Sequence, residues 1–94
     1  MRYGIRTELA GVSREQYDAL HEQFKAITDD TDRIVVHVSG PTSGGWYVFE
    51  VWESKADYER FMQKALPLLP PGAPRPSMQE FEVYTCQTAD QLRA

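Results

Sequence analysis

Four residues near the middle of the chain have side chains that could do chemistry together: His37, Trp46, Glu50 and Trp52. A neutral imidazole can take a proton from a phenol or an enol near neutral pH, and a nearby carboxylate can orient it. Two indole rings can form flat apolar walls for an aromatic molecule. This set therefore predicts a small proton-transfer site, with His37 and Glu50 as catalytic residues and the two tryptophans as substrate-binding residues.

A β-hairpin has to position these residues. Two segments rich in β-branched and aromatic residues, RIVVHVS and WYVFEVWE, are separated by GPTSGG, which is typical of a hairpin over residues 33–53. We expect a four-residue loop bracketed by Gly40 and Gly45, so that position 37 lies opposite 48 and position 35 opposite 50. Alternation along the strands then gives two unlike faces.

One face of this hairpin is apolar and is expected to be core. It consists of Ile34, Val36, Val38, Tyr47, Phe49 and Val51. The other face includes a histidine and a carboxylate, which are costly to bury unless they are paired or line a pocket. It consists of Arg33, Val35, His37, Ser39, Trp46, Val48, Glu50 and Trp52.

The candidate polar residues of this face each have a structural alternative. His37 is either a general base or a hydrogen-bonded residue of the core or of an interface. Glu50 either orients His37 or forms an ion pair with Arg33 or Arg6. The sequence leaves both alternatives open.

The aromatic candidates also have alternative roles that the sequence leaves open. Trp46 is a pocket wall or a dimer contact, and Trp52 an aromatic anchor of the fold. His21 reaches the cavity or is a core histidine. Tyr17, Tyr58 and Phe61 belong to the core by default, and the two hydroxyl groups are candidate hydrogen-bond donors to a ligand.

Composition narrows the class of protein. The 94 residues are expected to form a single domain, 1–94, whose net charge of −4 and lack of a Lys/Arg cluster argue against nucleic-acid binding. No apolar run approaches the roughly 18 residues of a membrane span, and the N-terminus has no signal-peptide pattern. We therefore expect a cytoplasmic protein that binds no membrane. The single Cys86 is expected to be structural.

The elements around the hairpin follow from periodicity and capping patterns. Residues 3–9 alternate as a strand, and residues 13–28 repeat apolar residues at helical spacing behind a Ser13–Gln16 capping box. Ser54 is expected to cap a second helix, which Pro67 distorts or stops. A proline-rich loop over 67–77 and a last strand around 80–85 follow, and the tail is expected to be loose or a short helical end.

The resulting order is β-α-β-β-α-β, which predicts an α+β, ferredoxin-like fold with two helices on one side of an antiparallel sheet. Two helices cover only one face of the sheet. The other face retains large apolar groups, and a second copy of the chain is the cover that we expect. The sequence therefore predicts a homodimer.

The middle of the chain resembles the antibiotic-biosynthesis-monooxygenase (ABM) superfamily, in particular its small bacterial members. The motifs that carry the resemblance are H-x-x-G at 37–40, GGW at 44–46 and VWES at 51–54, followed by Tyr58 and Phe61. The resemblance implies a dimeric α+β barrel with a ligand cavity between helices and sheet. It also implies relatives of several kinds: cofactor-free oxygenases of aromatic polyketides, haem-degrading enzymes, and lactone isomerases or cyclases.

The function expected from residues and resemblance together is a cofactor-independent monooxygenase acting on an aromatic or polyketide-like small molecule. The alternatives are a cyclase or isomerase, and a non-catalytic dimeric binding or accessory protein. We expect no cofactor and no metal, since the sequence has no C-x-x-C, H-x-x-x-H or glycine-rich phosphate motif. Haem is not expected either, because the resemblance places its histidine ligand on the second helix, where residues 55–69 contain none.

Overall fold

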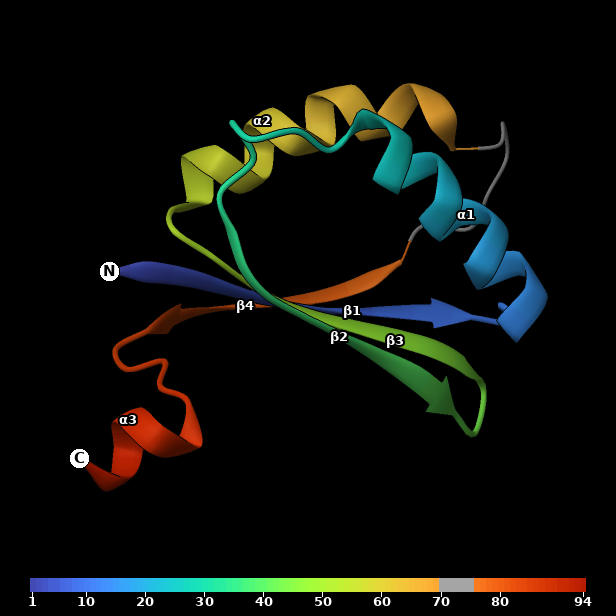
Figure 1. The fold of residues 1–94 in the computed structure, drawn as a ribbon. Helices are drawn as coiled ribbons and strands as arrows, with labels where there is room; N and C mark the ends of the chain where they lie inside the picture. Colours follow the sequence, from blue (N-terminus) through green and yellow to red (C-terminus); the bar gives the residue numbers. More distant parts are fainter. Residues whose placement is uncertain (70–75) are drawn as a thin grey trace.

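The computed structural model describes residues 1–69 and 76–94 and has the predicted order of elements (Figure 1). The elements are β1 (Arg2–Ala10), α1 (Arg14–Ile27), β2 (Ile34–Thr42), β3 (Gly45–Trp52), α2 (Lys55–Ala65), the 3₁₀ turn η1 (Leu66–Leu68), β4 (Ser77–Val83) and α3 (Ala89–Arg93). The α+β, ferredoxin-like prediction is confirmed. No helix in the described part of the chain is long and apolar enough to cross a membrane.

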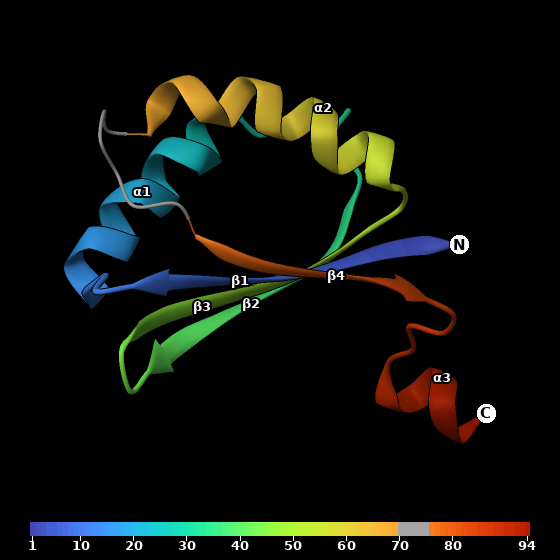
Figure 2. The same cartoon turned by 180° about the vertical axis from the view of Figure 1, so that it is seen from behind.

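The strands form one antiparallel sheet in the order β2-β3-β1-β4. Helices α1 and α2 lie together over one face of this sheet, as both views show (Figures 1 and 2). The C-terminal segment with α3 lies on the other side of the sheet. Because β2 is an edge strand, residues on it are close to solvent as well as to α1.

The helix boundaries follow the predicted caps. Ser13 accepts a hydrogen bond from the backbone N–H of Gln16, whose side chain in turn accepts one from the backbone of Ser13, so the capping box is present. Ser54 caps α2 through the backbone N–H of Asp57. Pro67 lies in η1, where the chain tightens from α-helix to 3₁₀ turn, as expected of a proline at that position.

The predicted register of the hairpin is wrong by two residues. Strand β2 continues to Thr42 and pairs it with Gly45, so the loop has two residues rather than four, and His37 lies opposite Glu50 rather than opposite position 48. Gly40 and Pro41 belong to the strand. Pro41 is tolerated because β2 is an edge strand, where a missing N–H need not break a ladder.

Because the error is an even number of residues, the predicted division into two faces survives it. The helices, however, cover the face that carries His37 and Glu50. The prediction that the apolar face is core is right for Val51, which is 4% exposed, and wrong for Val38, which is 45% exposed on the helix-free side. Ile34 is also exposed, next to an irregularity in the β2–β3 ladder between residues 34 and 36.

The core lies between the sheet and α2. It contains Tyr3, Ile5, Trp52, Phe61 and Ala65, with Phe24, Ile27, Tyr58 and Met62 packed against it. Trp52 is 1% exposed, and its ring centroid lies 5.4 Å from that of Phe61. Truncating a buried aromatic of this kind costs about 3–5 kcal/mol, so Trp52 is a major contributor to the free energy of unfolding.

The C-terminal region differs from the prediction in its boundaries. Strand β4 begins at Ser77 and ends at Val83, earlier than the predicted span at both ends. The tail forms α3, which starts with a second capping box between Thr88 and Gln91, so the short helical end is confirmed. Most of the predicted proline-rich loop, residues 70–75, lies outside the described residues.

Candidate functional site

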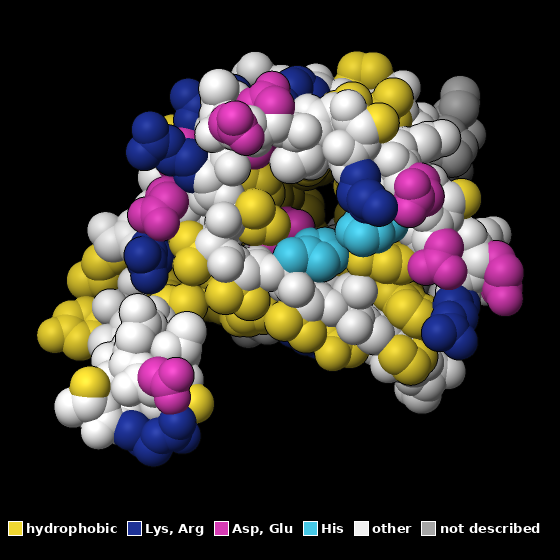
Figure 3. Space-filling model, in the orientation of Figure 1, with side chains coloured by type: hydrophobic (Ala, Val, Ile, Leu, Met, Phe, Trp, Pro, Cys, Tyr) yellow, Lys and Arg dark blue, Asp and Glu magenta, His cyan; other side chains and the backbone are white. Residues whose placement is uncertain are grey.

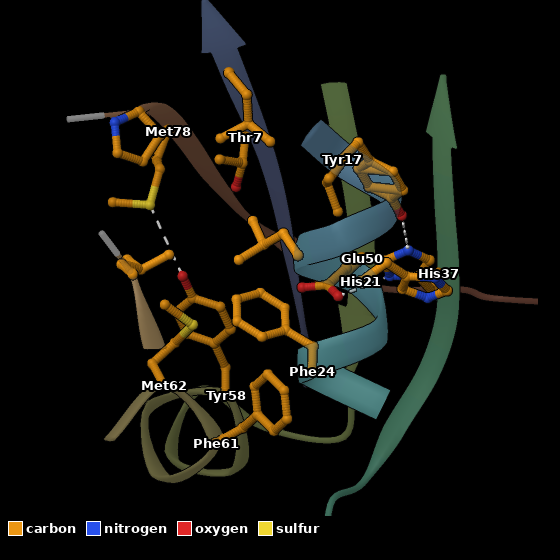
Figure 4. Close-up of a pocket in the computed structure, with 15 residues that line it drawn as sticks. Thr7, Tyr17, His21, Phe24, His37, Glu50, Tyr58, Phe61, Met62 and Met78 are labelled. Atoms are coloured by element: carbon orange, nitrogen blue, oxygen red, sulfur yellow. Dashed lines mark hydrogen bonds and ion pairs between the residues drawn. The ribbon is translucent and has the colours of Figure 1, made fainter. Parts of the chain in front are cut away.

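A cavity of about 120 Å³ lies between α1, α2 and the sheet. By the same measure a single water molecule needs about 10–15 Å³, so the space is sufficient for a small organic ligand. The cavity is lined by Thr7, Leu9, Tyr17, Leu20, His21, Phe24, His37, Val48, Glu50, Tyr58, Phe61, Met62, Leu69, Pro76 and Met78 (Figure 4). Most of these side chains are apolar, and Tyr17, His21, His37 and Glu50 form a polar cluster at one side.

His37 and Glu50 are paired across the β2–β3 ladder. Nδ1 of His37 lies 2.9 Å from Oε2 of Glu50, and the two side chains are 33% and 17% exposed. The second carboxylate oxygen, Oε1, accepts a hydrogen bond of 3.3 Å from Nε1 of Trp52. The buried indole and the imidazole therefore hold the carboxylate from two sides.

The other ring nitrogen of His37 is also engaged. The hydroxyl oxygen of Tyr17, on α1, lies 2.9 Å from Nε2. An ionised Glu50 can only accept, so the neutral imidazole carries its proton on Nδ1 and donates it to Glu50. Nε2 then has a lone pair and accepts a hydrogen bond from the Tyr17 hydroxyl. The result is a continuous hydrogen-bond chain from Tyr17 through His37 and Glu50 to Trp52.

Stacked aromatic rings fix the position of Tyr17. Its ring centroid lies 5.2 Å from that of Trp46 and 5.5 Å from that of His21, with interplanar angles of 27° and 17°. His21 in turn stacks on His37 at 5.5 Å and 14°. Figure 3 shows the two histidine side chains next to each other at the edge of a hollow between helices and sheet. Offset stacking of this kind restricts ring rotation, so the Tyr17 hydroxyl is held in place.

The opposite side of the cavity is formed by Tyr58 and Met78. The Tyr58 hydroxyl donates to the sulfur of Met78 at 3.8 Å (Figure 4). Burial, followed by the negative charges of Glu50 and Glu80, raises the pKa of Tyr58 to about 12. Tyr58 is therefore a neutral phenol at physiological pH, and the negative charge of Glu50 acts across the cavity.

The structure brings six of the eight predicted site residues to this cavity: Tyr17, His21, His37, Glu50, Tyr58 and Phe61. The two tryptophans are not among the lining residues. Trp52 lies behind Glu50 in the core, and Trp46 lies behind the Tyr17 ring, with its Nε1 buried and without a hydrogen-bond partner among the described residues. The predicted role of these indoles as cavity walls is thus not what the geometry shows.

Several lining residues were missed. Leu20, Phe24 and Met62 lie on the apolar stripes of the two helices, and Val48 shares a face with Glu50, so sequence patterns could have identified them. Met78 had no such signal, because the predicted last strand began too late to include it. Glu50 does not pair with Arg6 or Arg33 in the described ion pairs: Arg6 pairs with Glu8.

The described residues contain no group of three or more His, Cys, Asp or Glu side chains that could hold a metal ion. They do not fit an iron porphyrin either. Helix α2 has no histidine, both ring nitrogens of His37 are hydrogen bonded, and the ring of His21 is stacked on those of Tyr17 and His37.

Solved structures with the same architecture are found at low sequence identity. A variant of SnoaB, a cofactor-independent oxygenase from Streptomyces nogalater, matches with a TM-score of 0.59 at 11% identity, over 90% of this chain and 93% of that chain. The haem-degrading protein Rv3592 from Mycobacterium tuberculosis matches with a TM-score of 0.59 at 17% identity, over 94% and 96%. The chain has an ABM-like fold.

A third structure, of MhuD with two manganese protoporphyrin IX molecules bound per active site, matches with a TM-score of 0.59 at 17% identity, over 95% of this chain and 100% of that chain. No protein-family model matches the sequence, and neither does any curated protein. At such identities the comparison shows that the chain shares the fold of these proteins. What it does has to be argued from its own cavity.

Proposed function

We propose that this ABM-like chain is a cofactor-independent monooxygenase for a small hydroxylated aromatic molecule. The observation that carries the proposal is the 2.9 Å contact between Nδ1 of His37 and Oε2 of Glu50 in the wall of an otherwise apolar cavity. An imidazole oriented by a carboxylate is a general base suited to neutral pH. The fold shared with SnoaB, itself a cofactor-independent oxygenase, supports the same class of reaction.

The reaction needs a base, an apolar space and dioxygen. His37 receives a proton from the substrate hydroxyl, and Glu50 balances the positive charge on the imidazolium. The resulting electron-rich anion transfers one electron to dioxygen, and the two radicals combine to a peroxide anion at a ring carbon that still carries a hydrogen. This anion takes back the proton held on His37 and becomes a hydroperoxide. Loss of water from this CH–OOH group leaves a carbonyl, so a CH₂ group and O₂ become C=O and H₂O. The substrate supplies all the electrons.

The lining residues favour a flat apolar substrate with one polar edge. Phe24, Phe61 and Met62 form apolar walls, and the hydrogen-bond acceptors of the cavity lie on the side that contains Glu50. An anionic substrate is disfavoured there, because Glu50 would repel it. A neutral phenol or enol, such as a hydroxyanthrone, combines an apolar ring system with an ionisable hydroxyl group and an oxidisable CH₂.

The test is oxygen uptake with a panel of hydroxyanthrones and naphthols, followed by mass spectrometry of the product formed under ¹⁸O₂. We expect one O₂ consumed per substrate and one ¹⁸O atom in the new carbonyl, without added metal or flavin. Tight binding of these compounds with no uptake above the uncatalysed rate would contradict the proposal.

A second candidate, a non-catalytic binding protein, is favoured by one observation: both nitrogens of His37 are already hydrogen bonded, so neither is free to meet a ligand. In that case the chain from Tyr17 to Trp52 serves only to fix α1 on the sheet. Binding without turnover would then be the result of the same assay. A cyclase or isomerase, which would use the same base without dioxygen, would show substrate conversion under nitrogen.

A further inference from the structure

We propose that Tyr17 is the residue that meets the substrate, and that the proton reaches His37 through the Tyr17 hydroxyl. This inference rests on the proposed function and adds a catalytic residue to it. The proton of the substrate hydroxyl passes to the Tyr17 oxygen while the Tyr17 proton passes to Nε2 of His37. The products are a substrate oxyanion, an unchanged Tyr17 phenol and an imidazolium paired with Glu50.

Both hydrogen-bonding atoms of the His37 imidazole are occupied. Nδ1 is held by Glu50 and Nε2 by Tyr17, each at 2.9 Å. An imidazole has only these two hydrogen-bonding atoms. A substrate therefore cannot reach a lone pair of His37 without displacing one partner.

The Tyr17 oxygen keeps acceptor capacity for a ligand. A phenol that donates its proton still has oxygen lone pairs with which it can accept a hydrogen bond. The Tyr17 side chain lines the cavity, and the residue is only 8% exposed. The donor that can reach its oxygen is therefore a hydroxyl group of a ligand in the cavity. In Figure 4 its hydroxyl points to His37 at the polar side of the cavity.

The Tyr17 ring is held in place before a substrate binds. Trp46 and His21 both stack on the Tyr17 ring, which restricts its rotation away from His37. A proton relay needs short donor–acceptor distances that are already formed before the substrate binds. The stack provides this, and it explains why Trp46 belongs to the site although it does not line the cavity.

The test compares Tyr17→Phe with His37→Gln and the control Tyr84→Phe, which removes a hydroxyl from a residue that is 87% exposed and outside the cavity. Stopped-flow mixing of each protein with a hydroxyanthrone under nitrogen follows formation of the coloured oxyanion separately from its reaction with oxygen. The relay predicts a loss of about 10²-fold or more in the rate for both cavity variants and none for the control. If His37 contacts the substrate directly, Tyr17→Phe frees Nε2 and the rate stays the same or rises, which would overturn the inference.

A binding experiment tests the same contact without any chemistry. If Tyr17 accepts a hydrogen bond from the ligand, the wild-type protein should prefer 2-naphthol to 2-methoxynaphthalene by about 3- to 10-fold, the range for one neutral hydrogen bond. Tyr17→Phe should abolish this preference, and His37→Gln, which keeps a partner for Tyr17, should retain it. A preference that persists in Tyr17→Phe, or that is absent from the wild type, would overturn the inference. Naphthol preference combined with no oxygen uptake would instead reject the monooxygenase function alone.

Discussion

The hydroxyl oxygen of Tyr17 lies 2.9 Å from Nε2 of His37, although the first residue belongs to helix α1 and the second to the edge strand β2. With the Glu50 contact on Nδ1, this bond makes the imidazole the central member of a hydrogen-bond chain. A histidine in such a chain has a defined tautomer and orientation.

Glu50 sets the tautomer, so Glu50→Gln should remove the base while keeping the shape. The amide of glutamine can donate to Nδ1, which moves the imidazole proton to Nε2 and leaves no lone pair there. We expect turnover to fall by about 10²- to 10⁴-fold. The matched control is Glu53→Gln, which changes a carboxylate that pairs with Arg2 on the surface. Equal turnover for both variants would show that Glu50 has no part in the reaction.

Tyr58 should titrate late in a spectrophotometric pH titration. Burial, followed by the charges of Glu50 and Glu80, raises its pKa to about 12. Since the pKa is higher in the folded state than the unfolded value of about 10, the stabilisation is complete below pH 10 and is lost as the pH rises towards 12. The phenolate signal lost in Tyr58→Phe identifies this group, and Glu50→Gln should lower its midpoint. A midpoint near 10 in the wild type would contradict the assignment.

The helix-free face of the sheet should be covered by a second copy of the chain. Phe81 stacks on Phe49 there at 5.8 Å, and Val38 is 45% exposed beside them. A stable dimer buries about 800 Å² on each partner. We expect a dimer at micromolar concentration by light scattering.

The variant that tests this dimer is Val38→Arg, which should give a monomer because it places a charge in the buried interface. Leu66→Arg is the matched control, since Leu66 is 57% exposed in η1, on the helix side of the sheet. If the wild-type protein is a monomer, the prediction that a second copy covers this face is wrong.

Hemin should not bind stoichiometrically. Helix α2 offers no histidine, and the rings of His21 and His37 are held in stacking and hydrogen-bond contacts. Titration should give only the broad, non-saturating absorbance change of free hemin. A sharp Soret shift that saturates at one or two equivalents would be the opposite result, and His21→Ala and His37→Ala would then show which ring holds the iron.

The sequence predicted the elements well because their signals are local. Ser13 and Ser54 cap the helices where their patterns indicated, and Pro67 ends the second helix. The hairpin register failed because Gly40 and Pro41 are turn-forming residues, whereas an edge strand accepts both. A Cβ on Gly40 would lie 3.0 Å from the Tyr47 ring, so this glycine serves a close cross-strand contact rather than the turn.

The site was predictable only where strand pairing determined it. His37 and Glu50 share a face in either register, because the error of two residues preserves the alternation. Their contact with Tyr17 depends on how α1 packs on β2, and no pattern along the chain contains that information. For the same reason the sequence could not show that the helices cover the polar face and leave Val38 and Phe49 on the open one.

The most direct test of the central claim measures oxygen uptake and thermal unfolding on the same variant, His37→Ala. The proposed base predicts a loss of about 10²- to 10⁴-fold in turnover per folded molecule, in addition to the stability lost with the contacts to Tyr17 and Glu50. A purely structural His37 predicts only the destabilisation, about 1–3 kcal/mol, with ordinary activity per folded molecule. That second result would contradict the account and remove His37 from the mechanism.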